Sequence, residues 1–226
     1  MADNITKEDM ILSYENALNS LKSSLSSTDT TAKIKLMNSY YNWVFLQTQL
    51  VQNEKAFKIP ASALPNTFSK AAHDWLRPDK QALFDKYYRY DFSTGKFIIN
   101  IRKENIPYND IDLLMHSMVL TRKSVLWVEF GVNVGAEFGG RHPALVLKNM
   151  DDSFIVIPLS SQKPKTDKFS VRIDSVFGFP TLTRWANVSR IREIDISRID
   201  FTQKIGNVNS GVMKLISDKM HSCGII

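Results

Sequence analysis

The sequence predicts an α+β protein. A mainly helical N-terminal domain is expected over residues 1–122, followed by a small antiparallel β-barrel domain with a C-terminal helix over residues 123–226. Two observations carry this prediction. In the first half, apolar residues recur every three or four positions, as they do on one face of a helix. The second half consists of short β-branched runs separated by turn signals, which is typical of strands.

Two long helices are expected at the N-terminus. The first runs from about Thr6 to Leu25 and the second from about Thr31 to Gln52, with a polar break rich in serine and threonine between them. Such a short connection predicts an antiparallel helical hairpin. The aromatic, apolar face of the second helix is either the ordinary core face of this pair or a surface that binds a partner.

Shorter elements are expected between this hairpin and residue 122. Pro60 and Pro65 indicate a connector. Basic residues (Lys and Arg) alternate with aromatic residues over Lys86–Phe92. Such a segment either stacks on nucleic acid or folds back on the protein core. The expected elements are helices at about Ser69–Leu76, Asp79–Tyr88 and Asn109–Leu120, and a strand at Lys96–Arg102.

The second half is expected to form five or six short strands and one helix. Short antiparallel strands that close on themselves form a small barrel. Asn209 or Ser210 is a suitable N-cap for the final helix. The main elements are strands at Ser124–Phe130, Pro143–Lys148, Phe154–Leu159, Lys168–Ile173 and Arg184–Arg190, and a helix near Asn209–Met220.

Composition limits the possible environments of the protein. A hydrophobic fraction of 43% and an aromatic fraction of 11% are enough for folded cores. The net charge of +6 permits a polyanionic partner. The single cysteine, Cys223, excludes an internal disulfide and is compatible with a reducing cytoplasm. No apolar run approaches the roughly 20 residues that span a bilayer, and no signal peptide is visible, so a cytoplasmic protein without a membrane partner is expected.

The most distinctive stretch is the loop between the first two strands of the second half. Residues 131–143 hold four glycines and end in Arg141, His142 and Pro143. Glycines let another molecule approach the backbone, and Pro143 fixes the exit angle and favours an extended His142. Hydroxyl and amide side chains at Ser160–Gln162 follow the third strand. Cationic and hydroxyl groups are therefore expected where strands leave the sheet.

Three motifs in this order resemble the MazF/PemK (also Kid) family, the toxins of type II toxin–antitoxin systems. They are Trp127–Phe130, Gly135–Leu147 and Ile157–Gln162, and Ser189–Asp195 stands in the place of a later family segment. The resemblance covers about residues 124–221. It implies a strongly curved SH3-like sheet with a terminal helix and a two-fold homodimer. It also implies cleavage of single-stranded RNA with no metal or other cofactor, and neutralisation by a separate antitoxin protein.

In this family, an arginine directly before the proline of the second motif and a threonine or serine after the third strand form the catalytic pair. The second residue maps onto Ser160, whereas His142 stands in the arginine's position and Arg141 one step earlier. A one-residue shift turns a strand side chain to the opposite face. Either His142 takes the role, or a bulge at Gly139–Gly140 brings Arg141 round.

The predicted catalytic residues are His142, Ser160 and Arg141. A histidine can act as acid or base near neutral pH, an arginine can clamp a phosphate, and the serine hydroxyl can hold a phosphate oxygen. The alternative for His142 is a structural imidazole at a strand end. No Gly-x-Ser-x-Gly elbow indicates a serine hydrolase, and no His/Cys spacing indicates a metal site.

Further polar residues are candidate substrate contacts. Lys163 begins a lysine-rich stretch that either follows an RNA backbone or is a solvated loop. Glu137, in the glycine loop, either contacts substrate, orders the loop or is solvated. Ser189 stands where some family members carry an acidic residue that helps catalysis. The full candidate set is Glu137, Gln162, Lys163, Asn187, Ser189 and Arg192.

Two functions therefore stay open. The first is a toxin that acts as a metal-independent endoribonuclease on single-stranded RNA. The second is a catalytically degenerate module of the same fold that binds RNA or an antitoxin-like protein, because His142 and Ser189 depart from the family pattern. The helical half is either an extra dimer contact, a built-in inhibitor or a targeting arm.

Overall fold

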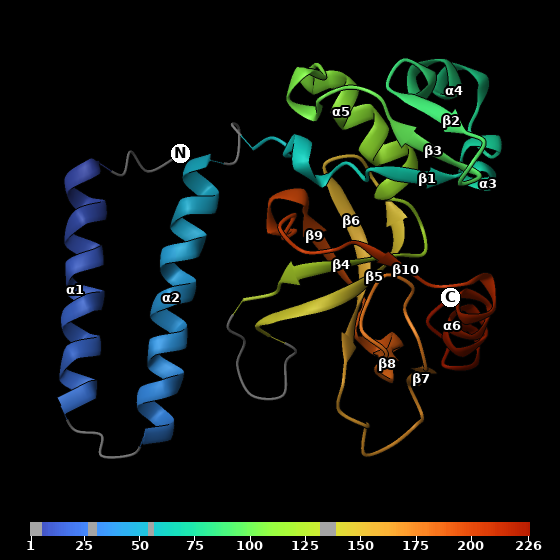
Figure 1. Cartoon of the computed structure of the whole chain (residues 1–226). Coiled ribbons are helices and arrows are strands. Elements are labelled where there is room, and N and C mark those ends of the chain that lie inside the picture. Colours follow the sequence, from blue (N-terminus) through green and yellow to red (C-terminus); the bar gives the residue numbers. More distant parts are fainter. Residues whose placement is uncertain (1–5, 27–30, 54–56, 132–138) are drawn as a thin grey trace. The chain divides into compact units, whose positions relative to one another are not determined.

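The computed structural model describes residues 6–26, 31–53, 57–131 and 139–226 (Figure 1). The chain divides into two compact units, Met1–Val51 and Gln52–Ile226. In the described part of the chain, no helix is both long enough and apolar enough to cross a membrane.

The first unit contains two long helices, α1 (Lys7–Ser26) and α2 (Thr31–Asn53). They run antiparallel, as Figure 1 shows, and their bounds confirm the prediction to within one residue. Thr6 fixes the start of α1, because its Oγ1 accepts a hydrogen bond from Asp9 N (3.1 Å) and Asp9 Oδ2 accepts one from Thr6 N (2.9 Å). This reciprocal arrangement is a capping box with an aspartate in place of the usual glutamate.

The second unit begins with a small three-stranded sheet of order β1-β3-β2, flanked by two short helices. Its elements are β1 (Thr67–Ser69), α3 (Lys70–Asp74), α4 (Pro78–Asp85), β2 (Tyr88–Asp91) and β3 (Lys96–Ile99). The helix predicted to reach Tyr88 ends at Asp85. Tyr88 instead opens β2, where its ring stacks on Phe84 at 4.4 Å. Pairing of Tyr88 with Ile99 of β3 places the residue in the sheet and outweighs the local helical pattern.

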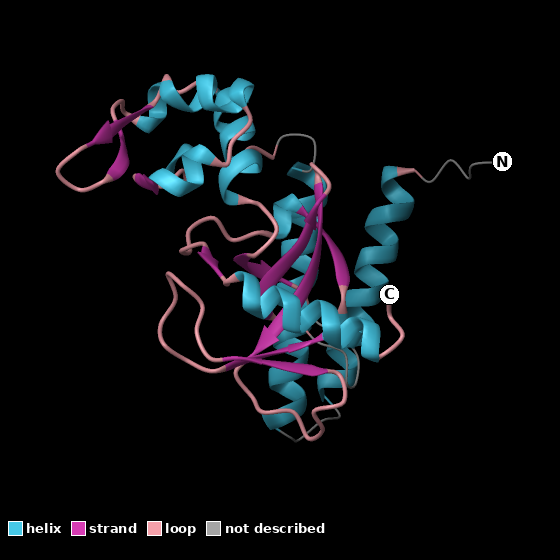
Figure 2. Ribbon diagram, turned by 90° about the vertical axis from the view of Figure 1, so that its right-hand side faces the viewer, coloured by secondary structure: helices cyan, strands magenta, loops and turns pink. Residues whose placement is uncertain are grey.

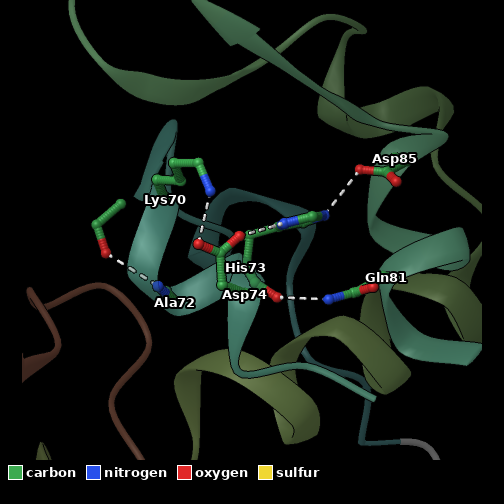
Figure 3. Close-up of polar contacts among 7 residues, drawn as sticks. Lys70, Ala72, His73, Asp74, Gln81 and Asp85 are labelled. Atoms are coloured by element: carbon green, nitrogen blue, oxygen red, sulfur yellow. Dashed lines mark hydrogen bonds and ion pairs between the residues drawn. The ribbon is translucent and has the colours of Figure 1, made fainter. Parts of the chain in front are cut away.

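Figure 3 shows how α3 is fastened to α4. His73 Nε2 lies 3.1 Å from Asp85 Oδ1, and Gln81 Nε2 donates to His73 O (3.2 Å). Lys70 and Asp74 form an ion pair of 2.7 Å along α3. The His73 ring also stacks on Phe97 of β3 at 4.4 Å, so this cluster ties both helices to the small sheet.

The segment of basic and aromatic residues at Lys86–Phe92 is divided between core and surface. Tyr87 and Tyr88 are buried, which fits the core interpretation, whereas Phe92 is 91% exposed. The predicted helix over Asn109–Leu120 is present. It consists of α5 (Tyr108–Leu114) followed by the π-helical segment η4 (Met115–Val119).

A curled antiparallel sheet follows (Figure 2). It has seven strands in the order β10-β4-β5-β6-β8-β7, and β9 also pairs with β6. β6 pairs with β9 through residues 153–156 and with β8 through Leu159 and Ser160. The sheet therefore turns along β6, which confirms the predicted curved β-domain of an α+β fold. The strands are β4 (Ser124–Glu129), β5 (Arg141–Asn149), β6 (Ser153–Ser160), β7 (Ser170–Ile173), β8 (Arg184–Asn187), β9 (Arg192–Asp195) and β10 (Gly206–Asn207).

The C-terminal helix α6 (Ser210–Ser222) is present as predicted. Asn209 is its N-cap, because the Asn209 Oδ1 atom accepts a hydrogen bond from Val212 N at 2.9 Å. Met213 and Ile216 on the inner face of α6 are buried in one of the two cores of this unit. Short 3-10 helices complete the description: η2 (Ala61–Ala63), η3 (Lys103–Asn105), η5 (Val188–Arg190) and η6 (Ile196–Arg198).

Alternate residues of the sheet supply two separate cores. Val128, Ala144 and Val146 belong to a core that also contains buried residues from 59 to 120. Their neighbours Val125 and Leu145 belong to a second core with β7, β8 and α6. Residues before 122 thus share a core with the sheet, and the compact units divide the chain near residue 51. The boundary near 122 stays a prediction for the place where the motif-bearing part begins.

Candidate active site

The β5–β6 hairpin brings two predicted catalytic residues to one end of the sheet. The last pair of its ladder is Ala144↔Pro158. His142 lies two residues before Ala144, and Ser160 lies two residues after Pro158. From Leu159 onward β6 turns to pair with β8, so the two strands diverge here. His142 and Ser160 are thus the next residues on the two strands beyond the last ladder pair of the same parity, at the open end of the hairpin.

Both residues point to the same face. Val128, directly opposite His142 in the β4–β5 ladder, belongs to the core that contains Ala144. Residues opposite each other or two apart in a strand share a face. By the same rule, Ser160 shares a face with Val156, which lies in that core too. The core ends before this edge, because His142 and Ser160 are both only partly buried.

His142 is held in a state that favours the neutral imidazole. Partial burial lowers the pKa of His142 below its ordinary value, and the Glu129 carboxylate and a hydrogen bond with the Gly139 backbone oppose this shift. Gly140 has φ of +78°, a conformation that glycine adopts freely. This conformation turns the chain into β5 directly before Arg141 and His142.

Ser160 is oriented by its own chain. The backbone N–H of Gln162 donates to Ser160 Oγ at 3.0 Å. A hydroxyl has one donor and two acceptor positions, so this contact leaves the Ser160 O–H able to donate to a substrate. Gln162 and Lys163 themselves are exposed on the loop that follows β6.

Arg141 lies on the opposite face of β5. It pairs in register with Glu129, forms an ion pair with Asp200, and places its Cζ atom 5.5 Å from the centre of the Trp127 ring. Trp127 stacks in turn on Phe179 at 6.0 Å. The two glycines before Arg141 thus do not bring its side chain to the His142 face. His142, and not Arg141, shares the face of Ser160.

Other predicted contacts fall at different distances from this pair. Asn187 follows Trp185 by two residues on β8, and Trp185 lies directly opposite Ser160. Asn187 is therefore a diagonal neighbour of Ser160 on the same face. Its Oδ1 atom accepts hydrogen bonds from Ser189 N (3.0 Å) and Ser189 Oγ (2.7 Å). Ser189 thus orients Asn187.

Arg192 shares this face from further away. It lies opposite Val156 in the β6–β9 ladder, four residues before Ser160. Four residues of strand span about 13 Å. Arg192 therefore lies about that far from Ser160 along the sheet. Glu137 lies outside the described residues. Within residues 6–26, 31–53, 57–131 and 139–226, no group of three or more His, Cys, Asp or Glu side chains is placed to hold a metal ion.

Residues 121–223 match the family model described as "PemK-like, MazF-like toxin of type II toxin-antitoxin system". Residues 121–223 form a PemK/MazF-like toxin domain. The match agrees with the motifs at about 124–221 and leaves the helical N-terminal part outside the domain. A search of curated proteins found no match.

Solved structures similar to the PemK/MazF domain cover about half of this chain. MazF (Form-I) from Deinococcus radiodurans is 22% identical, with a TM-score of 0.39, and the alignment covers 48% of this chain and 98% of that one. For the Mycobacterium tuberculosis toxin MazF-mt6 the values are 11%, 0.35, 45% and 96%. For MazE-MazF (Form-II) from Deinococcus radiodurans they are 20%, 0.34, 46% and 92%.

Trp185 of the PemK/MazF domain was missed by the sequence interpretation. It was assigned only to an expected strand, because nothing local connects it to Ser160, 25 positions earlier. The β6–β8 ladder places the two directly opposite each other. Trp185 is partly exposed, and an aromatic ring in such a position can stack on a nucleic-acid base. The one local feature of the sequence that could have placed Trp185 in the site is its position two residues before the candidate Asn187.

Proposed function

We propose that the PemK/MazF domain is a toxin endoribonuclease that cleaves single-stranded RNA without a metal cofactor. The observation that supports this proposal is the register that sets His142 and Ser160 on one face at the open end of the β5–β6 hairpin. In RNA cleavage by an internal nucleophile, a partly buried imidazole can serve as the base, and an oriented hydroxyl can donate to the charge that develops on the phosphate.

The proposed reaction is attack of a ribose 2′-OH on its own 3′-phosphate. Neutral His142 accepts the 2′-OH proton, which its lowered pKa makes possible at neutral pH. The Ser160 O–H donates to a non-bridging phosphate oxygen as negative charge develops there. The bond between phosphorus and the 5′-oxygen breaks, the departing 5′-oxygen takes a proton from solvent, and protonated His142 returns its proton to solvent. The products are a 2′,3′-cyclic phosphate and a 5′-hydroxyl.

The neighbouring side chains would hold the RNA in place. Asn187 and Trp185 flank Ser160 on β8 and would contact the base or ribose next to the cleaved bond. Arg192, about 13 Å along the strand, and Lys163 on the exposed loop would contact neighbouring phosphates. Such contacts position the chain and carry little sequence information.

A homodimer and a separate antitoxin protein complete the proposal. The family that residues 121–223 match is described as the toxin of a type II toxin-antitoxin system, so a cognate antitoxin is the expected partner. We infer that this protein inhibitor covers the His142 and Ser160 edge of the domain. A toxin of this kind acts on RNA in the cytoplasm, which is the location proposed for this protein.

The test is incubation of the purified full chain with a long single-stranded RNA in the presence of EDTA, with mapping of the cut ends. Discrete cuts that leave cyclic phosphate and 5′-hydroxyl ends are expected. A chain in which both His142 and Ser160 are replaced by alanine is the control. Absence of cleavage at every pH, together with RNA or antitoxin binding that survives the double replacement, would instead establish the degenerate binding module.

Arg141→Ala is expected to lower cleavage less than about tenfold, because Arg141 faces Asp200 and Trp127 on the far side of β5. Removing a donor aimed at the reacting phosphate typically costs about 10²–10³-fold. Steady-state rates on a short RNA distinguish a loss below about tenfold from a loss of about 10²–10³-fold. A loss of about 100-fold would restore the phosphate-clamp role predicted from the sequence and would require Arg141 to leave Asp200.

Trp185→Ala is expected to raise KM for RNA by about 5- to 100-fold, since base stacking on an aromatic ring contributes about 1–3 kcal/mol. The value of kcat should change much less, because Trp185 donates nothing to the reacting phosphate. Trp185→Phe keeps a stacking surface and should recover most of the affinity. An unchanged KM in Trp185→Ala would remove this residue from the binding site.

A further inference from the structure

We propose that the α1–α2 hairpin pairs with the same hairpin of a second copy of this chain and forms a four-helix bundle. This contact would be separate from any contact made by the PemK/MazF domain. It assigns a role to the N-terminal unit, which lies outside the matched domain.

Several large apolar side chains of the hairpin are exposed to water. Among the side chains of residues 6–53 whose burial the structure describes, none is buried. On α1, Ile11 is 49% exposed and Tyr14 57% exposed, although they lie on the apolar stripe of that helix. On α2, Tyr40 is 45% exposed and Phe45 64% exposed. The pairing of α1 with α2 therefore leaves these four apolar side chains exposed.

The sequence of α2 indicates a helix with apolar neighbours on more than one side. Residues 36–53 contain no charged side chain. Tyr40 and Phe45 are five positions apart, which is about 140° around a helix, and both are exposed. A helix with apolar residues over most of its circumference is normally surrounded by other helices. The hairpin offers α2 a single neighbouring helix, α1.

The size of the unit also requires a partner. A chain of about 50 residues rarely buries enough apolar surface to be stable without an added constraint such as oligomerisation. The only cysteine of the chain, Cys223, lies in the other unit, so no disulfide can staple the hairpin. Association is therefore the remaining source of stability that this composition offers.

A second copy fits this surface better than a charged partner. Residues 36–53 combine apolar side chains with neutral Asn, Gln, Ser and Thr, so a two-fold pair brings no like charges together. A helix of 23 residues is about 34 Å long and about 10 Å wide. A two-helix face then covers roughly 700 Å², and a pair buries roughly 1,400 Å², within the roughly 1,200–2,000 Å² of a stable interface.

Cysteine cross-linking of the full chain tests this proposal directly. In a Cys223→Ser background, Tyr40→Cys near the middle of α2 should form an intermolecular disulfide under mild oxidation. Asn42→Cys is the matched control, because Asn42 is also exposed but lies about 200° further round the helix. Equal cross-linking of both positions, or of neither, would overturn the proposal.

Sedimentation equilibrium gives a second, independent measurement. Tyr40→Glu should raise the dimer dissociation constant at least about 100-fold, because two carboxylates lose water without cationic partners. Asn42→Glu should change it less than about threefold, and both variants should keep their helical circular dichroism because glutamate favours helices. If Tyr40→Glu leaves the dissociation constant as little changed as Asn42→Glu does, the hairpin instead binds its own chain or another protein, and the four-helix bundle is wrong.

Discussion

Replacing His142 with alanine is expected to lower the rate of RNA cleavage by about 10²–10⁴-fold, the usual loss for a general acid or base. His142 shares a face with Ser160 at the end of the β5–β6 ladder, so the replacement removes the proposed base from beside the reacting phosphate. The value of kcat/KM on a short fluorogenic RNA measures the loss. KM should change little, since the imidazole acts on a proton and holds no phosphate.

The assignment of His142 as the base also predicts how kcat/KM depends on pH. Burial lowers the pKa of His142 from its ordinary value of 6.5, so the imidazole stays neutral at pH values where an exposed histidine is half protonated. As base, His142 is active above its own pKa, and kcat/KM should fall only as pH drops through that lowered pKa. The acid limb should therefore lie below the ordinary value of 6.5.

His142→Arg distinguishes the chemical role from a structural one. It places the usual family residue in this position, and an arginine does not titrate in this range. An arginine cannot accept the 2′-OH proton, so this variant should keep or raise activity by stabilising the charge that develops on the phosphate, and its acid limb should be flat. If His142→Ala cleaves RNA as well as the unmodified protein does, the imidazole is structural and the assignment of the site is wrong.

Ser160→Ala is expected to reduce kcat by about 10²–10³-fold, because it removes the proposed donor to the charge that develops on the phosphate. The Ser160 hydroxyl is oriented by Gln162 N, which donates to Ser160 Oγ at 3.0 Å. Ser161→Ala is the matched control, since Ser161 is an exposed neighbour with the same side chain. It should lose less than about threefold, because its hydroxyl is not aimed at the phosphate.

Ser160→Thr keeps the hydroxyl and should retain activity within about tenfold, because a threonine occupies this place in other members of the resembled family. Single-turnover rates separate these effects from changes in product release. Equal losses in Ser160→Ala and Ser161→Ala, or no loss in either, would show that Ser160 does not act on the phosphate.

Much of the fold could be predicted because its signals are local. The periodicity of apolar residues fixed both long helices to within one residue, and Asn209 marked the start of α6. The β-branched runs located the central strands. The error at Tyr88 has a tertiary cause, since its pairing with Ile99 of β3 draws it into a strand where local propensity would continue the helix.

Sequence reasoning identified the residues of the candidate site but not their arrangement. Motif order identified His142, Arg141 and Ser160 together, and the sequence left open which of the first two faces Ser160. Strand pairing decides this, because each residue in a ladder takes its face from its partner, and the partner is distant in sequence. The pairs Val128↔His142 and Glu129↔Arg141 send the two neighbours to opposite faces.

By itself, then, the sequence determined the elements of this protein and the PemK/MazF motifs, because both depend on residues close together in the chain. The tertiary structure decided that His142 shares a face with Ser160, that Trp185 lies opposite Ser160, and that residues 59–120 share a core with the sheet. These features depend on register and packing between residues up to tens of positions apart, and local patterns contain no information about such pairings.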